Sequence, residues 1–383
     1  MRRLIVAALL SSALLVPVVH ADENEAFLVK IGRDTLLLEK STRSKNEVKG
    51  EYVTRSPRSA HRTYTMDLGP DGFVRRFDLV TRPLGATPGR ETRASIMFEG
   101  DSATTTAPRG DSMFTTRVAA GKGAAPFVYG LMGCIEQLAR QARAAGGTTY
   151  RVNLISAGAT QPQLATVTRA GGDTLLLHTE TATGKAGPWV IRLDKQGRLV
   201  GYSGVGTPFQ AEMTPLAKLD IEAAKASYAA RPLGTLSARD TARARLGDVE
   251  LWVDYGRPSR RGRQIFGAVV PWDQVWRTGA NAATQFHTSA DLMIGDTAVP
   301  AGTYTLWTLP SKAGWKVIIN KQSAQWGTEY HPDQDLARVA ATTETLTEPV
   351  ETLTITIEPR ADGAQLQIAW DTTRVSIPIR RKV

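Results

Sequence analysis

The sequence has little cysteine, little histidine and, beyond its N-terminus, no long apolar run. Cys134 is the single cysteine of 383 residues, so a disulfide within the chain is excluded. After residue 21 no apolar run reaches the roughly 20 residues that a membrane-spanning helix needs. The fold must therefore be stabilised by apolar cores, and Cys134 itself, which lies in an apolar segment, is expected to be buried.

The N-terminus has the three parts of a secretory signal. Arg2 and Arg3 precede an apolar run over residues 4–19, and Val19 and Ala21 stand at −3 and −1 before the acidic stretch 22–25. The alternative, a membrane anchor, is disfavoured because the run is shorter than a spanning helix. We therefore expect residues 1–21 to be removed and the protein to be exported, either to the periplasm or outside the cell.

Positive charge exceeds negative charge, with 47 Lys and Arg against 37 Asp and Glu, a formal net charge of +10. Net charge bears on solubility and nonspecific binding, so a basic exported protein can meet anionic lipid or cell-wall polymer. Nucleic acid is not an expected partner, because the chain carries an export signal and no nucleic-acid-binding motif.

Residues 22–232 read as a β-rich domain. Strand-like runs at 27–31 and 35–38 flank the turn 32–34, and the same pattern returns at 165–169 and 174–177 around 171–173. Each pair is followed by another predicted hairpin, at 64–80 and at 190–202. These runs predict an antiparallel curved sheet, half-barrel-like in form. Whether the two sets are an internal duplication or a chance similarity is left open.

One strong helix is expected near residues 126–145, between these two sets of hairpins. Apolar residues recur at three- and four-residue spacing from Phe127 to Ala142, Pro126 suits a first helical position, and Gly146 with Gly147 ends the pattern. A second helix is expected over 219–229. A helix packed into a curved sheet would bury the apolar stripe.

Residues 233–383 consist of short strand-like runs separated by turns. The predicted strands are 240–246, 249–254, 291–294, 297–299, 303–309, 315–320, 352–357, 365–370 and 374–379. Many short strands at this spacing, with almost no helical period, predict a β-sandwich or jelly-roll-like domain.

Several strings in this second half occur in an order typical of one group of exported bacterial domains. They include Tyr255 to Ser259, Trp276 to Asn281 (WRTGAN), Pro300 to Tyr304 (PAGTY) and Trp370 to Val375. Residues 236–379 resemble the family called "domain of unknown function 2911". The resemblance implies the identity of the domain, and no activity is established for the family. The first half is not covered by it.

The stretch 253–281 holds the best candidates for ligand binding. Four arginines, Arg257, Arg260, Arg261 and Arg263, lie within seven residues, and guanidinium groups bind carboxylate or phosphate in bidentate fashion. Alternatively they are solvated or paired with local acids such as Asp254 and Asp273. Arg277 precedes a glycine turn and is expected to be partly buried, as a structural anchor with an acidic or carbonyl partner ahead of a ligand contact.

The second half also holds tryptophans at positions 272, 276, 307, 315, 326 and 370. Aromatic faces suit sugar rings, although most tryptophans of a small β-domain belong to its core. The ligand-binding candidates are Arg257, Arg261, Arg263, Arg277, Asn281, Trp276 and Trp326.

No catalytic constellation is evident. His287, Ser289 and Asp291 alternate along one predicted strand, where side chains two apart are roughly 7 Å from each other, too far for a hydrogen-bonded triad. His331, Asp333 and Asp335 give a weak metal-ligand pattern in a polar turn. No catalytic residue, metal or cofactor is therefore assigned.

The working hypothesis is an exported, non-catalytic cell-envelope protein that binds an anionic or glycan-like ligand through its C-terminal domain. One alternative is an uncharacterised hydrolase or metal-dependent enzyme that uses His287 and His331. Another is a scaffold that binds a protein partner through the N-terminal sheet.

Overall fold

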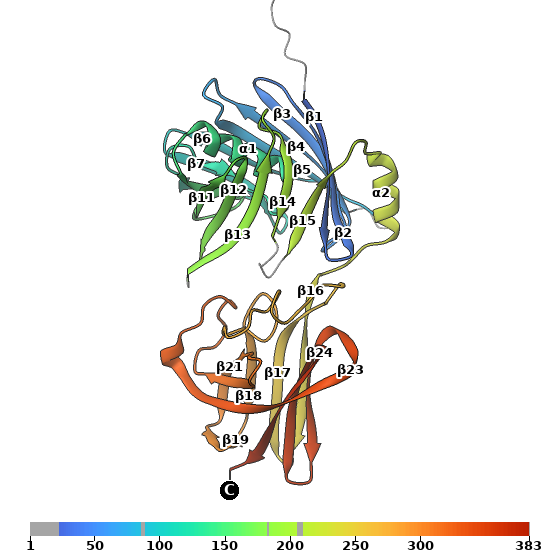
Figure 1. The fold of residues 1–383 in the computed structure, drawn as a ribbon, viewed down its shortest axis with the longest axis vertical. Coiled ribbons are helices and arrows are strands. Elements are labelled where there is room, and N and C mark those ends of the chain that lie inside the picture. Colours follow the sequence, from blue (N-terminus) through green and yellow to red (C-terminus); the bar gives the residue numbers. More distant parts are fainter. Residues whose placement is uncertain (1–22, 86–88, 182–183, 205–209, 383) are drawn as a thin grey trace, which may run out of the picture.

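The protein consists of two β-rich parts that follow each other along the chain (Figure 1). The structure is a computed structural model that describes residues 23–85, 89–181, 184–204 and 210–382. The predicted signal peptide, residues 1–21, lies outside these residues. Residues 23–232 are called here the N-terminal domain and residues 233–382 the C-terminal domain. The mainly β fold with one large sheet in each part is the fold class that the sequence predicted.

The N-terminal sheet is antiparallel throughout its described strands except at one edge, where β9 and β10 are parallel. The strands lie in the order β8-β7-β6-β5-β4-β3-β2-β1-β15-β14-β13-β12-β11-β10-β9. Their bounds are β1 Glu23–Ile31, β2 Asp34–Arg43, β3 Glu47–Thr54, β4 Ala60–Leu68, β5 Val74–Pro83, β6 Thr92–Glu99, β7 Ser102–Arg109, β8 Ser112–Ala119, β9 Ala125–Pro126, β10 Thr149–Ile155, β11 Gln163–Gly171, β12 Thr174–Thr181, β13 Gly184–Leu193, β14 Leu199–Ser203 and β15 Ala211–Pro215.

The predicted hairpins are confirmed, as β1–β2, β4–β5, β11–β12 and β13–β14. The two sets are not equivalent strand for strand, because β3 lies between the first two hairpins whereas β12 pairs directly with β13. The pairing of β1 with β15 joins the two ends of the domain into one sheet.

The helix α1 spans Met132–Ala144, so the prediction that it begins at Pro126 was wrong. Ala125 and Pro126 instead form β9 against the edge of β10, and the Phe127 amide donates to the Ile155 carbonyl at 2.8 Å. Proline can occupy this edge because its missing N–H is not needed there. The predicted C-terminal end is correct, since Gly146 and Gly147 both adopt left-handed φ angles.

A buried glutamate from the sheet holds the N-terminus of α1. The Glu39 carboxylate on β2 accepts hydrogen bonds from the amides of Met132 at 2.8 Å and Gly133 at 2.9 Å, and from the Tyr64 hydroxyl at 2.8 Å. The first amides of a helix lack intrahelical partners, so a carboxylate stabilises them. Burial raises the pKa of Glu39 to about 7, while these hydrogen bonds favour its charged form.

The core of the N-terminal domain surrounds α1. Buried side chains of the helix, among them Cys134, Ile135 and Leu138, form one apolar cluster with residues from nearly all the strands. Cys134 is buried, as expected. The second helix, α2 (Ile221–Ala230), lies on the outer side of the sheet beside β2 and β3, close to the predicted position (Figure 1).

The C-terminal domain is a second sheet that folds back on itself around one core. Its described strands lie in the order β16-β17-β18-β21-β22-β23-β24-β19-β20. Their bounds are β16 Ser237–Leu246, β17 Val249–Pro258, β18 Thr284–Thr288, β19 Leu292–Ile294, β20 Thr297–Val299, β21 Gly302–Leu309, β22 Trp315–Asn320, β23 Asp335–Arg360 and β24 Gly363–Arg381, and a short 3-10 helix covers Pro332–Gln334.

The two longest strands, β23 and β24, connect the layers of this domain. The first part of β23 pairs with β22, and its second part lies across from β17, where the Ile355 amide donates to the Tyr255 hydroxyl at 2.9 Å. Side chains from β17 through β24 meet in a single apolar cluster. No helix in the described part of the chain is long and apolar enough to cross a membrane.

We expect Glu39→Gln to destabilise the folded protein by about 2 kcal/mol at about pH 8, where the native carboxylate is charged. The side-chain NH₂ of the new glutamine would replace one carboxylate oxygen, and it cannot accept the backbone N–H that this oxygen accepts. Urea unfolding followed by circular dichroism measures the change, with Glu99→Gln, at an exposed position, as the control. Equal stability of the two variants would show that Glu39 does not hold the helix.

Candidate functional site

A cavity with a mixed polar and apolar wall lies between the two domains. Its volume is about 950 Å³. The N-terminal domain contributes Ile31, Pro57 and Tyr129, and the C-terminal domain contributes Trp276, Arg277 and Trp326, among others. This volume lies at the upper end of the range for small-molecule sites, roughly 300–1,000 Å³. The cavity therefore belongs to both domains.

A contact at Arg261 brings the two domains together beside this cavity. The Arg33 amide, in the turn between β1 and β2, donates to the Arg261 carbonyl at 2.9 Å, and the Arg261 guanidinium pairs with the Asp34 carboxylate. A Cβ atom on Gly32 would lie 2.1 Å from the Arg261 carbonyl oxygen. A side chain at position 32 is thus excluded, and the close approach of the domains requires glycine.

The C-terminal domain in turn fixes Arg261 through a carboxylate. Glu351 Oε1 accepts the backbone amide of Arg261 at 2.9 Å and lies 3.4 Å from Arg33 Nη2. Arg261 is only 9% exposed, and its φ of 54° is unusual for a residue with a side chain. Of the alternatives that the sequence left open, Arg261 is thus paired with an acid and is not solvated.

The other arginines of the predicted cluster also have local partners. Arg257 Nη1 donates to Asp240 at 2.9 Å and Arg257 Nε to the Leu353 carbonyl at 3.2 Å. Arg260 Nε lies 3.0 Å from an Asp371 oxygen. Arg263 donates to the Ser259 carbonyl at 2.6 Å and to the Arg260 carbonyl at 3.0 Å. The acidic partners of these arginines are not the predicted Asp254 and Asp273. Even so, most guanidinium groups of the cluster already have partners within the protein.

Arg277 is different, because no described residue offers it a hydrogen bond or an ion pair. Its Nε atom is buried without a partner, and burial alone lowers the pKa of its guanidinium. The expectation of an acidic or carbonyl partner for Arg277 was therefore wrong. Its side chain lies against Gly327, where a Cβ atom would approach Arg277 Cδ to 2.1 Å.

The turn 276–281 presents Arg277 to the cavity in a strained backbone conformation. Trp276 is anchored by reciprocal backbone hydrogen bonds to Thr308, at 2.8 and 2.9 Å. Thr278 and Asn281 have φ angles of 52° and 64°, which is costly above all for the β-branched threonine. Thr278 is fully buried and its hydroxyl bonds Thr308 at 3.2 Å, so packing maintains the strain.

Most tryptophans of the domain are packed, as expected, and one is not. Trp276 and Trp370 stack with centroids 5.8 Å apart, and Phe266 contacts both rings edge-on. Trp326 is 52% exposed, has no ring partner among the described aromatic residues and lines the cavity. The strand-like bridge between Ala282 and Trp326 fixes its backbone.

Six of the seven predicted ligand-binding residues line this one cavity: Arg261, Arg263, Arg277, Asn281, Trp276 and Trp326. Arg257 does not line it. Sequence reasoning missed the wall from the N-terminal domain, including Ile31, Pro57 and Tyr129. No local pattern marks these residues, since they reach the site only through the packing of one domain against the other.

The histidine candidates do not form a catalytic group in the structure. His287 on β18 stacks on Trp252 with centroids 5.0 Å apart and bonds the Thr303 hydroxyl at 2.9 Å. His331 precedes the 3-10 helix, and its backbone bonds Asn320 and Gln322. Neither imidazole forms an ion pair with a carboxylate among the described residues. Asp335 binds Tyr330 and Arg338 instead.

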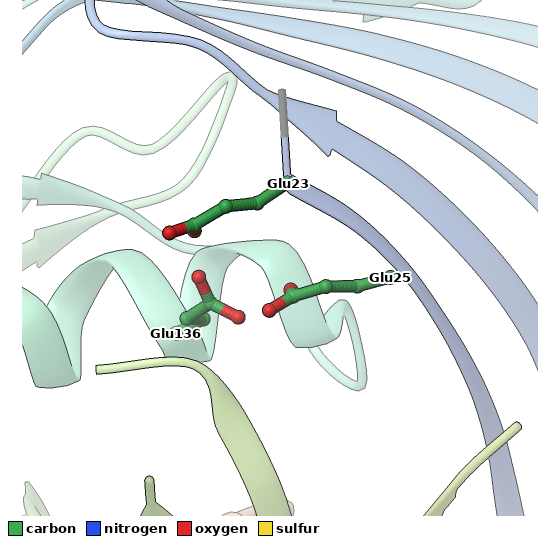
Figure 2. Close-up of side chains that lie close together, drawn as sticks. All are labelled: Glu23, Glu25 and Glu136. Carbon is green, nitrogen blue, oxygen red and sulfur yellow. The ribbon is translucent and has the colours of Figure 1, made fainter. Parts of the chain in front are cut away.

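A cluster of three carboxylates lies beside α1, where the side chains of Glu23, Glu25 and Glu136 point toward one another (Figure 2). Their ligand atoms lie within 4.8 Å of one another, which is close enough to surround a cation. However, Glu136 is already bonded by Arg140 at 2.8 Å and by Arg43 at 3.3 Å. The two guanidinium groups balance most of the negative charge.

A proton shared within the cluster balances the remaining charge. Burial, together with the hydrogen bond and charge of Glu136, raises the pKa of Glu25 to about 9. Burial also acts to raise the pKa of Glu136, but the hydrogen bond from Glu25 and the charges of Arg140 and Arg43 outweigh it and lower that pKa. Glu25 is therefore protonated at neutral pH and donates to Glu136.

The raised pKa of Glu25 makes stability depend on pH. Above about pH 4.5 the unfolded state releases the Glu25 proton, whereas the folded state keeps it up to about pH 9. The contribution of Glu25 to the free energy of unfolding is therefore lost as the pH rises from about 4.5 toward about 9. Glu25→Gln mimics the protonated acid and removes the titration. We expect the free energy of unfolding to fall more steeply between about pH 6 and 9 in the unsubstituted protein than in this variant. Urea titrations across this range measure both slopes, and parallel curves would contradict the shared proton.

Comparisons with known proteins identify only the second domain. A solved structure of a DUF1089 family protein from Pseudomonas aeruginosa is 17% identical, with a TM-score of 0.34, covering 45% of this chain and 91% of that one. A beta-barrel-like protein of DUF1849 from Brucella abortus is 15% identical, with a TM-score of 0.35, covering 50% and 95%. No curated protein sequence matches the chain. Residues 237–379 match the family model described as "Protein of unknown function (DUF2911)". The C-terminal half of the chain therefore matches the DUF2911 family, as the sequence resemblance predicted, and the N-terminal half has no family match.

Proposed function

We propose that this is an exported, non-catalytic binding protein that holds an anionic ligand in the cavity between its two domains. The observation that carries the proposal is Arg277, a guanidinium beside the cavity without an acidic partner among the described residues. A buried charge without a partner costs several kcal/mol, so such an arginine is favoured where a ligand supplies the opposite charge. Export rests on the N-terminal sequence pattern.

The surroundings of Arg277 support a built site. The turn that carries it has a strained backbone at Thr278 and Asn281. Backbone strain of this kind clusters at ligand-binding and active sites, where it fixes the geometry of the site. Gly327 leaves room for the arginine side chain, because a Cβ atom at this position would lie 2.1 Å from Arg277 Cδ. The contact at Arg261 holds the opposite wall in place. These features give the guanidinium one position before a ligand arrives, which reduces the entropy cost of binding.

The proposal predicts two effects of Arg277→Met. The free protein should be as stable as the unsubstituted protein or more stable, because a desolvated charge has been removed. Anions that raise the unfolding temperature of the unsubstituted protein should have no effect on the variant. A saturating ligand at about 100 times its Kd adds about 2.7 kcal/mol, so the difference is measurable by thermal unfolding with a panel of organic acids and phosphates.

Arg257→Met is the matched control. It removes an arginine on β17 that bonds Asp240 and does not line the cavity. Its response to anions should equal that of the unsubstituted protein. If no organic anion raises the unfolding temperature, or if Arg277→Met responds as strongly as the control, the proposed function is wrong.

A further inference from the structure

Among the described residues that line the cavity, one guanidinium has neither an ion pair nor a hydrogen bond. Three arginines line it, and no aspartate or glutamate does. Arg261 is paired with Asp34, and Arg263 donates to two backbone carbonyls. Of the Arg277 nitrogens, only Nε is buried without a partner. The two terminal nitrogens reach solvent and can donate to a ligand. This inference rests on the proposed function and concerns the kind of anion.

One guanidinium matches one negative charge. A carboxylate carries a single charge and accepts two parallel hydrogen bonds from a guanidinium. A phosphate monoester carries close to two charges at neutral pH, and only Arg277 offers open guanidinium donors, because the guanidinium groups of Arg261 and Arg263 already have partners. The open donors of the site therefore match a carboxylate better than a phosphate.

Trp326 supplies a flat surface next to this guanidinium. Its ring is half exposed and unpacked, unlike the stacked pair Trp276 and Trp370. The next residue, Gly327, lies against the Arg277 side chain, and consecutive Cα atoms are only about 3.8 Å apart. The backbone of this segment is fixed, since the Gly327 amide donates to the Asn281 carbonyl at 3.0 Å. One small molecule can therefore contact the guanidinium and the ring together.

Exposed amides complete the polar part of the wall. The side chains of Asn281 and Gln274 line the cavity, are exposed and make no hydrogen bond to a described residue. A side-chain amide offers both hydrogen-bond donors and acceptors. It can therefore bond the hydroxyl groups of a ligand, whereas a hydrocarbon chain gives it no hydrogen-bond partner. A ligand with hydroxyls around a ring fits these groups better than a fatty acid does.

We propose that the ligand is an acidic sugar, a carbohydrate with a carboxylate on its ring. The carboxylate binds Arg277, one face of the sugar ring packs on Trp326, and hydroxyls bond the amides of Asn281 and Gln274. The cavity volume, about 950 Å³, leaves room for more than one sugar unit.

The test is isothermal titration calorimetry of residues 22–383, the chain without its predicted signal peptide, with galacturonate, which carries one carboxylate, as the probe. Its methyl ester is the matched neutral probe, and glucose 6-phosphate, decanoate and 2-naphthoate distinguish the other anions. We expect galacturonate to bind most tightly of the five. We expect its methyl ester to bind at least about tenfold more weakly, because a hydrogen bond to a charged group contributes about 1.5–3 kcal/mol.

Three variants separate the contributions. Trp326→Ala should weaken galacturonate binding about fivefold to tenfold through loss of the ring contact. Gly327→Ala should weaken it comparably by pushing the Arg277 side chain aside, and its unfolding temperature without ligand reports whether the fold survives. Arg257→Met should leave the affinity unchanged.

Decanoate, 2-naphthoate or glucose 6-phosphate binding as tightly as galacturonate would overturn the assignment of an acidic sugar. Undiminished binding by Trp326→Ala would also overturn it. In either case, dependence of binding on Arg277 would leave the proposed anion-binding function standing. Failure of all the anions to bind would contradict both.

Discussion

The cavity exists because one glycine turn of the N-terminal domain docks on one arginine of the C-terminal domain. Gly32 lies so close to the Arg261 carbonyl that no side chain fits between them, and Arg261 bonds Asp34 on one side and Glu351 on the other. Arg261 is nearly buried, so its charge is partnered within the structure, as burial of a charge requires. This contact holds together the two domains whose residues, among them Tyr129 and Trp326, line the cavity.

The arginines of the segment 257–277 therefore have two different roles, which cannot be told apart from the sequence. Arg257, Arg260, Arg261 and Arg263 have carboxylate or carbonyl partners and hold strands and domains in place. Arg277, which looks less distinctive because it stands apart from the cluster, has no such partner. In this structure the missing partner, and not the density of charge, marks the candidate for ligand binding.

Local patterns gave the hairpins, the strand-rich C-terminal domain and the end of α1 at Gly146, because each depends on residues close in sequence. They failed at Pro126, where pairing with the distant strand β10 prevailed over the preference of proline for a first helical position. They could not show that Arg277 lacks a partner or that Tyr129 lines the same cavity. Both depend on the packing of residues far apart in the sequence, which no window of sequence contains.

The central claim is that the Arg277 guanidinium is a ligand contact held open by the fold. Side-chain NMR of protein with isotope-labelled arginine tests it most directly, with the Arg277 Nε–H signal assigned by its loss in Arg277→Met. Addition of an organic carboxylate that binds the protein should move the Arg277 signal and leave the Arg257 signal unchanged. A bound carboxylate that leaves the Arg277 signal in place would contradict the account.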